Sequence, residues 1–413
     1  MRIGIIGTGI SGLVAAYLLQ DEHDLTVFEA NDYIGGHTHT VEVRREDGRY
    51  GVNTGFIVFN ELNYPNFVKL MRKLQVEWQD SFMSFSVQCA RTGLEYSPSS
   101  LDKIFAQRGN LFRPRFLKMI REIFRFRKEA AEVLKGEDYT TLGEYLKKHR
   151  YSREFEEYFI IPMGAAIWSA DPEDFRNIPM RFFVQFFTNH AFLQVHGQPQ
   201  WLTIRGGSSQ YVAKLTERFR DRIHLNCPIQ TIRRLSNGVE VHTDKGESDI
   251  FDQVVIAAHS DQALKILTDA TDQEREILGA LPYQENATVL HTDRSLLPNR
   301  EKVWASWNYY IPAELQKRVS VTYNMNILQN ISSSKVFCVT LNRSQDIDKT
   351  KIIRNLTYTH PIFTPAGISA QKRHGEISGV NRIHFCGAYW GYGFHEDGVN
   401  SALEVAKYFG KSL

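Results

Sequence analysis

The sequence predicts an α/β protein in which one domain is interrupted by another, and three observations support this prediction. The 413 residues exceed the usual length of one compact domain, and no Pro-, Ser- or Gly-rich linker divides them. A short apolar strand, a glycine-rich turn and an apolar helix occupy residues 2–20. The same order recurs at residues 381–410, so both segments are expected to belong to one domain.

Composition limits the class of protein. A hydrophobic fraction of 42% and a charged fraction of 23% are typical of a globular chain, and a net charge of +2 with no zinc-finger or RRM pattern argues against a nucleic-acid partner. No apolar run approaches the roughly 20 residues of a membrane span, and a strand follows Met1-Arg2 directly, leaving no room for a cleavable leader. The cysteines form no CxxC pair, so neither a metal site nor a disulfide framework is expected: Cys89, Cys227, Cys338 and Cys386. We therefore expect a cytoplasmic protein, either free or peripheral on the inner face of the cell membrane.

The first glycine turn has the GxGxxG spacing of a dinucleotide site. Gly7 permits a tight turn, Gly9 permits close approach of the backbone to a diphosphate, and Gly12 permits close packing of helix on strand. Ile10 and Ser11 then begin the helix, whose unpaired amides and dipole favour an anion. On its own this spacing is weak evidence.

A second strand strengthens the evidence for a dinucleotide site, because the segment DLTVFEA ends in Glu29-Ala30, about 20 residues after the turn. A carboxylate at this point accepts hydrogen bonds from both ribose hydroxyls and disfavours a 2′-phosphate. The two motifs together predict a bound dinucleotide other than NADP.

A glycine pair follows in NDYIGGHTHT, at Gly35-Gly36. Here the chain resembles the flavoprotein family of amine oxidases, phytoene desaturases and protoporphyrinogen oxidases, whose members carry this pair beside FAD. The resemblance implies FAD as cofactor, with His37 and Thr38 beside it. A basic residue, usually Arg, follows the pair in most members, so His37 departs from the pattern and either contacts the flavin or has only a structural role in the turn.

Further segments match the family in the order that it requires. TIRGGSSQ supplies another glycine turn before a helix, at Gly206-Gly207. The resemblance implies cofactor contacts from a loop near the flavin and from a strand near the adenine: Asn53, Thr54, Gly55, Pro228 and Ile229.

The segment GAYWGYGFHEDG resembles the closing flavin motif of the family. It implies that Gly387 lies near the ribityl phosphate and that Gly398-Val399 begin a helix facing the flavin pyrimidine. Ala388 stands where an acidic residue is common, which removes one expected cofactor contact. Asp397 is interpreted as the N-cap of this helix, with catalysis as the alternative.

The likeness to a bacterial group of predicted NAD/FAD-binding proteins spans almost the whole chain. Its relatives in furan fatty acid formation desaturate methylated acyl chains, which implies a lipid substrate. We expect a Rossmann-type FAD-binding domain formed by residues 1–80, 199–265 and 376–413. The inserted α+β substrate domain, formed by residues 81–198 and 266–375, is expected to combine a helical part with an antiparallel sheet.

Two apolar stretches suggest where a lipid could bind. Residues 108–128 interleave basic with aromatic and aliphatic side chains, and form either a helix at an anionic membrane surface or an ordinary amphipathic helix. Residues 178–193 hold phenylalanines that either line an acyl tunnel or belong to the core: Phe182, Phe183, Phe186, Phe187 and Phe192.

With FAD as cofactor, the expected function is an FAD-dependent oxidoreductase that transfers hydride from a hydrophobic, fatty acyl substrate to flavin N5. Tyr392, His395 and Glu396 are the candidate catalytic residues, because the closing motif brings them beside the flavin. Two alternatives stay open. The first is an amine oxidase with an aromatic wall from Tyr389, Trp390 and Tyr392, and the second is a flavin-dependent isomerase or mutase without net redox turnover.

Overall fold

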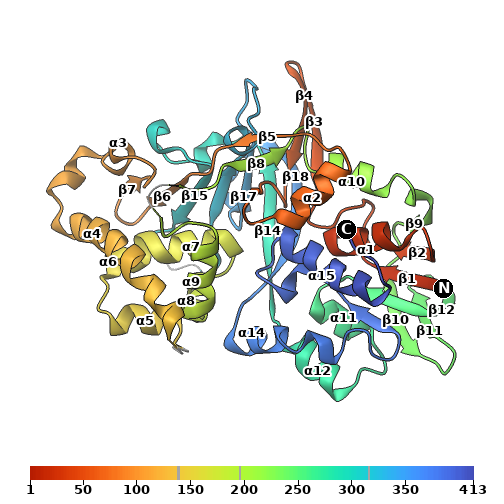
Figure 1. The fold of residues 1–413 in the computed structure, drawn as a ribbon. Helices are drawn as coiled ribbons and strands as arrows, with labels where there is room; N and C mark the ends of the chain where they lie inside the picture. Colours follow the sequence, from red (N-terminus) through yellow and green to blue (C-terminus); the bar gives the residue numbers. More distant parts are fainter. Residues whose placement is uncertain (137–139, 195–196, 315–316) are drawn as a thin grey trace.

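The protein has a part with a parallel sheet, a helical part, and a mixed sheet that joins them (Figure 1). The computed structural model describes residues 1–136, 140–194, 197–314 and 317–413. Both termini lie in the part with the parallel sheet, at the right of Figure 1. The predicted α/β fold, with two intertwined parts, is confirmed.

A five-stranded parallel sheet forms the core of the nucleotide part, in the order β19-β13-β1-β2-β9. Its strands come from the three segments predicted for the FAD-binding domain: β1 (Arg2–Ile6), β2 (Asp24–Phe28), β9 (Ile223–His224), β13 (Gln253–Ile256) and β19 (Ile383–Phe385). The central strands are apolar on both faces, as expected when both faces of a parallel sheet are covered.

Alternate residues of β1 face different layers. Ile3 and Ile5 pack with α1 (Ile10–Leu19) and α15 (His395–Tyr408), whereas Ile6 packs with a three-stranded antiparallel sheet. The strands of that sheet are β10 (Ile229–Arg234), β11 (Val239–Thr243) and β12 (Ser248–Phe251). The first and last long segments of the chain thus share one apolar layer.

The mixed sheet has seven strands in the order β18-β14-β17-β16-β15-β6-β7. They are β6 (Phe85–Cys89), β7 (Leu94–Tyr96), β14 (Tyr283–His291), β15 (Trp307–Ile311), β16 (Val321–Asn324), β17 (Cys338–Leu341) and β18 (Ile352–Pro361). The predicted antiparallel sheet is present between β14 and β18, but β6 pairs parallel to β15. Residues 81–198 therefore contribute strands as well as the predicted helices.

The helical part packs around one apolar cluster that includes the predicted phenylalanines. Its helices are α3 (Leu101–Ile104), η1 (Arg108–Phe112), α4 (Pro114–Glu129), η2 (Ala130–Lys135), α5 (Leu142–Lys148), α6 (Arg153–Phe155), α7 (Ile161–Trp168), α8 (Pro172–Arg176) and α9 (Met180–Asn189). Within the described residues, none of the helices is both long and apolar enough to cross a membrane.

The remaining elements connect these parts. They are β3 (Thr40–Arg45), β4 (Gly48–Asn53), α2 (Pro65–Lys73), β5 (Trp78–Ser81), β8 (Trp201–Ile204), α10 (Ser209–Thr216), α11 (Ser260–Ile266), α12 (Asp272–Gly279), α13 (Met325–Leu328), α14 (Pro365–Gln371) and η10 (Ala388–Trp390). Ile277 of α12 and Ala370 of α14 pack in the cluster of Ile256 and Phe385. Packing, unlike the predicted domain limits, places both helices with the nucleotide part.

Candidate active site

The first glycine turn has the backbone that a diphosphate site requires. Gly7 has φ +100°, and a Cβ there would lie 2.8 Å from the carbonyl oxygen of Ala257. A Cβ on Gly12 would overlap the carbonyl oxygen of Gly7, so helix and strand are in backbone contact. At Gly9, by contrast, a Cβ would meet nothing within 4 Å, so its backbone borders open space.

The second glycine turn, at Gly35-Gly36, contacts the first turn at Gly9. Gly36 has φ +57°, and a Cβ there would lie 3.1 Å from the Cα of Gly9. No side chain caps the N-terminus of α1, and its first turn contains no acidic residue. The free amides and the positive end of the helix dipole therefore face the space beside Gly9, which fits an anionic diphosphate.

Glu29 directly follows β2 beside this turn and is 5% exposed. One of its carboxylate oxygens accepts from the amide (2.9 Å) and hydroxyl of Thr8, and the other from the amide (2.9 Å) and Nδ2 (2.7 Å) of Asn31. These bonds fix the orientation of the carboxylate at the position expected to bind a ribose.

The predicted adenine segment runs alongside Glu29. The amide of Cys227 donates to the Glu29 carbonyl at 2.9 Å, and the amide of Asn226 donates to the Asn31 carbonyl at 3.0 Å. Pro228 and Ile229 follow directly, while Ala30 is exposed beside them. Residues distant in sequence thus come together on the adenosine side of the site.

The closing motif meets the first turn from the other side. A Cβ on Gly398 would lie 2.6 Å from Cγ2 of Ile10 and 3.0 Å from Oγ of Ser11, and 3.8 Å from Cβ of Ala388. The amide of Gly387 donates to Oγ of Ser401, two residues after buried Val399, at 3.0 Å. The N-termini of α1 and α15 therefore converge, and they bring the predicted residues Ile10, Ser11 and Gly398 together.

His37 follows the glycine pair and lies against β18. Its ring is 5.0 Å from that of Tyr358, 5.4 Å from His360 and 5.7 Å from His259. Burial, together with the neighbouring His259, lowers the pKa of His37 to about 3. His37 is therefore neutral at neutral pH and does not replace the positive charge of the arginine usual in the family.

The loop 53–55 lies between the glycine turns and β18. Oδ1 of Asn53 accepts from the amide of Ser208 at 2.9 Å, and Oγ1 of Thr54 lies 2.7 Å from the Tyr358 hydroxyl. A Cβ on Gly55 would overlap the carbonyl oxygen of His37. The loop is thus held directly against the residues that follow Gly36.

His395 is engaged in a buried network rather than open to substrate. Its Nε2 lies 2.9 Å from Oγ1 of Thr38 and 3.0 Å from the hydroxyl of Tyr211, and its ring stacks on Phe56 at 3.4 Å. Burial and the nearby His37 hold the pKa of His395 well below its usual value. These contacts connect His395 of α15 to α10 and to the residues that follow the glycine pair.

Glu396 and Asp397 both stabilise helix ends. Glu396 accepts from the amides of Asn66 (3.0 Å) and Phe67 (2.8 Å) in the first turn of α2, and burial raises its pKa. Asp397 accepts from the amide of Phe394 at 2.9 Å, so it is the third residue of α15 and not the predicted N-cap. Burial raises the pKa of Asp397 to about 7.

The three aromatic residues of the closing motif point in different directions. Trp390 packs on His374 at 4.3 Å, and Tyr389 is buried beside it at 4.9 Å. Tyr392 faces the helical part, where its ring lies 4.6 Å from Phe182. The predicted aromatic wall of Tyr389, Trp390 and Tyr392 is therefore not formed.

The phenylalanines of α9 divide into two groups. Phe183, Phe186 and Phe187 are buried in the core. Phe182 stays partly exposed and stacks on Phe363 at 4.9 Å as well as on Tyr392. The structure thus assigns most of this stretch to the core, and Phe182 and Phe186 contact the aromatic residues of the closing loop.

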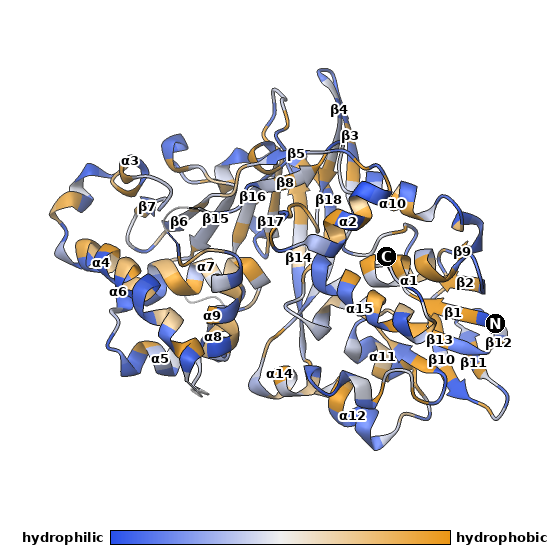
Figure 2. Ribbon diagram, viewed as in Figure 1, coloured by the Kyte–Doolittle hydropathy of each residue, from blue (hydrophilic) through white to orange (hydrophobic). Residues whose placement is uncertain are grey.

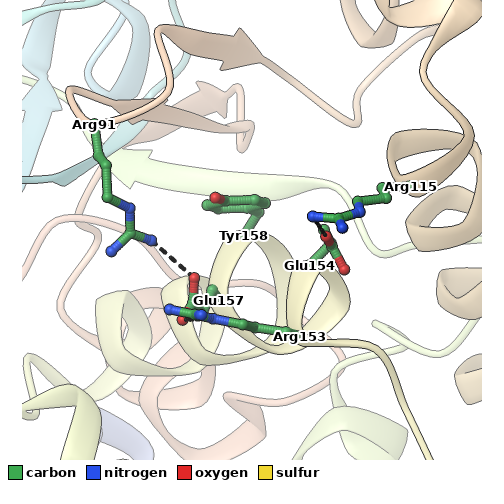
Figure 3. Close-up of a pocket in the computed structure, with 6 residues that line it drawn as sticks. All are labelled: Arg91, Arg115, Arg153, Glu154, Glu157 and Tyr158. Carbon is green, nitrogen blue, oxygen red and sulfur yellow. Dashed lines mark hydrogen bonds and ion pairs between the residues drawn. The ribbon is translucent and has the colours of Figure 1, made fainter.

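A surface hollow of about 280 Å³ lies in the helical part, away from the glycine turns (Figure 3). Its arginines are paired with glutamates, including Arg91 with Glu157 at 2.9 Å and Arg153 with Glu157 at 2.6 Å. We do not assign catalysis to this hollow, because none of the cofactor residues lines it.

Sequence reasoning missed residues that complete the site. Thr8 and Asn31 orient Glu29, Tyr211 holds His395, and Tyr358 and His360 project from β18. The alternation Tyr358-Thr359-His360 was the only available signal, because residues two apart on a strand share a face. The other contacts join residues far apart in sequence.

Comparison with known proteins agrees with this geometry. Residues 10–322 match the family model of flavin-containing amine oxidoreductases. A search of curated protein sequences finds no significant match.

Solved structures share the fold along the whole chain. Cyclohexylamine oxidase from Brevibacterium oxydans IH-35A is 17% identical, with a TM-score of 0.66 and 99% of each chain covered. A fatty acid isomerase from P. acnes is 16% identical, with a TM-score of 0.70, over 99% of this chain and 98% of its own. Putrescine oxidase, bound to putrescine, is 14% identical, with a TM-score of 0.68 and 99% of each chain covered. FAD is identified as the cofactor by the glycine turns, the convergent helix N-termini and the family match together. The chain belongs to the family of flavin-containing amine oxidoreductases and is an FAD-dependent oxidoreductase.

Proposed function

We propose that this oxidoreductase desaturates or oxidises a hydrophobic substrate, a lipid or a methylated fatty acyl chain. The observation that carries the proposal is the uncharged aromatic set beside the closing loop, made up of Phe182, Phe363, Tyr392, Phe394 and Trp168. Nε1 of Trp168 donates to the carbonyl of Tyr392 at 3.0 Å, which fixes the loop to the helical part. An acyl chain buries its apolar surface against such rings, whereas a charged amine loses hydration there.

The residues of this set orient the substrate and exclude water from it. When bound, FAD supplies the hydride acceptor, its N5 atom. Desaturation would remove a hydride and a proton from a saturated carbon pair, with the proton released to solvent at the edge of the site and the two electrons passed on to dioxygen or a quinone. Of the residues predicted to be catalytic, Tyr392 lies in the aromatic set and is proposed to position the substrate. His395 and Glu396 are proposed to hold the loop in place.

One alternative is isomerisation of an acyl chain without net oxidation. It is favoured by the fatty acid isomerase that shares this fold. Amine oxidation is less well supported, because the aromatic wall proposed for it is absent.

Anaerobic mixing separates these functions. The FAD-loaded protein is mixed with phosphatidylglycerol carrying monounsaturated or methyl-branched chains, and separately with cyclohexylamine and putrescine. We expect bleaching of the flavin by one of the lipids and a product two hydrogens lighter by mass spectrometry. Bleaching only by the amines would contradict the proposal, and a rearranged lipid without bleaching would indicate the isomerase.

A pair of variants connects this reaction to the aromatic set. Phe182→Ser should raise the lipid concentration for half-maximal flavin reduction about tenfold, because a Phe side chain contributes about 1.5–3 kcal/mol of apolar contact. Phe82→Ser removes a ring that is 60% exposed, and should leave that concentration unchanged.

A further inference from the structure

One face of α4 packs against the core of the helical part, and the opposite face is exposed to solvent. Phe116, Met119, Ile123 and Phe126 belong to the core of the helical part. Five large apolar side chains on the other side of the helix and in the segment before it are exposed to solvent. They are Leu101 (76% exposed), Leu111 (43%), Phe112 (86%), Leu117 (41%) and Phe124 (54%). Figure 2 shows α4 as a helix of mixed hydropathy at the outer end of the helical part.

Basic side chains surround these apolar ones. Residues 108–128 contain eight basic residues and one acidic residue, Glu122, in a chain of net charge +2. Among the described residues, Arg113, Arg121 and Lys128 have no ion-pair partner within 4 Å, although all three are exposed. Arg115 is 87% exposed and lies 3.7 Å from Glu154, at the edge of the hollow in Figure 3.

The acidic residues nearby do not neutralise this face. Glu122 is buried and accepts from the amide and hydroxyl of Ser152, and Asp102 is paired with Arg108 and Lys302. The unpaired cations therefore alternate with exposed rings on one surface. We call this surface the α4 surface and define it by its members: Leu101, Leu111, Phe112, Arg113, Leu117, Arg121, Phe124 and Lys128.

We propose that the α4 surface docks on an anionic lipid bilayer. Phe112, Leu117 and Phe124 would enter the boundary between headgroups and acyl chains, while Arg113 and Arg121 bind lipid phosphates. This combination matches the two components of interfacial binding, which are buried apolar area and attraction to anionic headgroups. The inference does not depend on the proposed function, although a lipid substrate would give the docking a purpose.

Charge complementarity selects the bilayer over other partners. A second copy of the α4 surface would bring unpaired cations against like charges, with no free acidic group to meet them. A nucleic-acid duplex, whose bases are stacked on one another, would leave the exposed Phe112 and Leu101 without a partner.

Vesicle co-sedimentation of the FAD-loaded full chain tests the proposal. The vesicles are phosphatidylcholine alone, or phosphatidylcholine mixed with phosphatidylglycerol. We expect retention on the mixed vesicles, release by high salt, and weak retention on phosphatidylcholine alone. No retention of the wild-type protein on the mixed vesicles would overturn the inference.

Matched variants locate the contact. Arg113→Glu/Arg121→Glu should weaken binding to the mixed vesicles at least about tenfold, since each cation near an anionic surface contributes about fivefold. The double variant Phe112→Ser/Phe124→Ser should weaken binding to both kinds of vesicle. The controls are Arg49→Glu, at an exposed position without an ion pair among the described residues, and Leu62→Ser, whose side chain is 64% exposed.

The visible flavin spectrum shows that each variant is folded and loaded with FAD. Equal binding by the α4-surface variants and the controls would overturn the inference. So would a wild-type dimer in size-exclusion chromatography that Phe112→Ser/Phe124→Ser dissociates, because the apolar face would then be an interface between two copies. Vesicle binding is measured without turnover, so its outcome is separate from that of the bleaching experiment.

Discussion

A Cβ atom on Gly36 would lie 3.1 Å from the Cα of Gly9, so two glycine turns from different strands touch at the N-terminus of α1. This contact leaves open space beside Gly9, at the uncapped N-terminus of α1.

Gly9→Val should fold and fail to hold FAD. A Cβ at Gly9 would meet no protein atom within 4 Å, and the Val side chain would occupy the space next to the helix N-terminus. We expect FAD affinity to fall at least about tenfold, or about 1.4 kcal/mol, in a titration followed by visible absorbance. The free energy of unfolding without FAD should change by less than about 0.5 kcal/mol.

Gly12→Val is the contrasting variant, because its side chain would overlap the carbonyl oxygen of Gly7 and should destabilise the protein itself. A Gly9→Val protein that binds FAD normally would contradict the assignment of this space.

Glu29→Gln should weaken both the fold and the cofactor site. The carboxylate accepts from Thr8 on one oxygen and from Asn31 on the other, so an amide NH₂ would face donors on either side. We expect the free energy of unfolding to fall by about 1–3 kcal/mol in urea, together with weaker FAD binding. Glu46→Gln, at an exposed position, serves as control, and equal effects of the two changes would count against the buried network.

Asp397 should make stability depend on pH. Its pKa is about 7 in the folded protein and 3.8 when exposed, so between these values the folded chain keeps a proton that the unfolded chain has released. Stability therefore falls as pH rises from about 4 to about 7, by up to about 1.4 kcal/mol per pH unit. Asp397→Asn should flatten this slope in urea unfolding with FAD in fixed excess, whereas a slope that persists would assign it to other groups.

His395→Gln should retain most of the flavin reduction. The ring is neutral and its Nε2 is engaged by Thr38 and Tyr211, so an amide can replace its hydrogen bonds. Removal of a general base typically costs about 10²–10⁴-fold, whereas we expect a loss within about tenfold. The rate is measured anaerobically at equal flavin content. A hundredfold loss of the rate of flavin reduction in His395→Gln, with no change of that rate in Tyr211→Phe, would instead indicate that His395 is the proton acceptor.

The cofactor half of the fold could be predicted because its signals are local. Gly7, Gly12 and Gly36 stand where the backbone needs a positive φ or close contact, and such requirements are visible in a short segment. The strands β6 and β7 were missed because they are short and gain their stability from β15, far along the chain.

The chemistry of the closing motif could not be predicted in the same way. Tyr389, Trp390 and Tyr392 are almost adjacent, but the chain turns at Gly391 and separates the ring of Tyr392 from the other two. The role of Glu396 depends on the amides of α2, which no pattern in its own segment indicates.

The packing of α15 on α1 has a consequence for biosynthesis. Ile10 is translated well before Gly398, yet a Cβ on Gly398 would lie 2.6 Å from Cγ2 of Ile10, because α15 packs on α1. The cofactor pocket can therefore be completed only after α15 has been translated, and until then α1 lacks the surface that covers it. Retention of FAD would then mark chains in which α15 has been made and has docked on α1: chains that end before α15 should stay colourless and be recognised by chaperones and proteases.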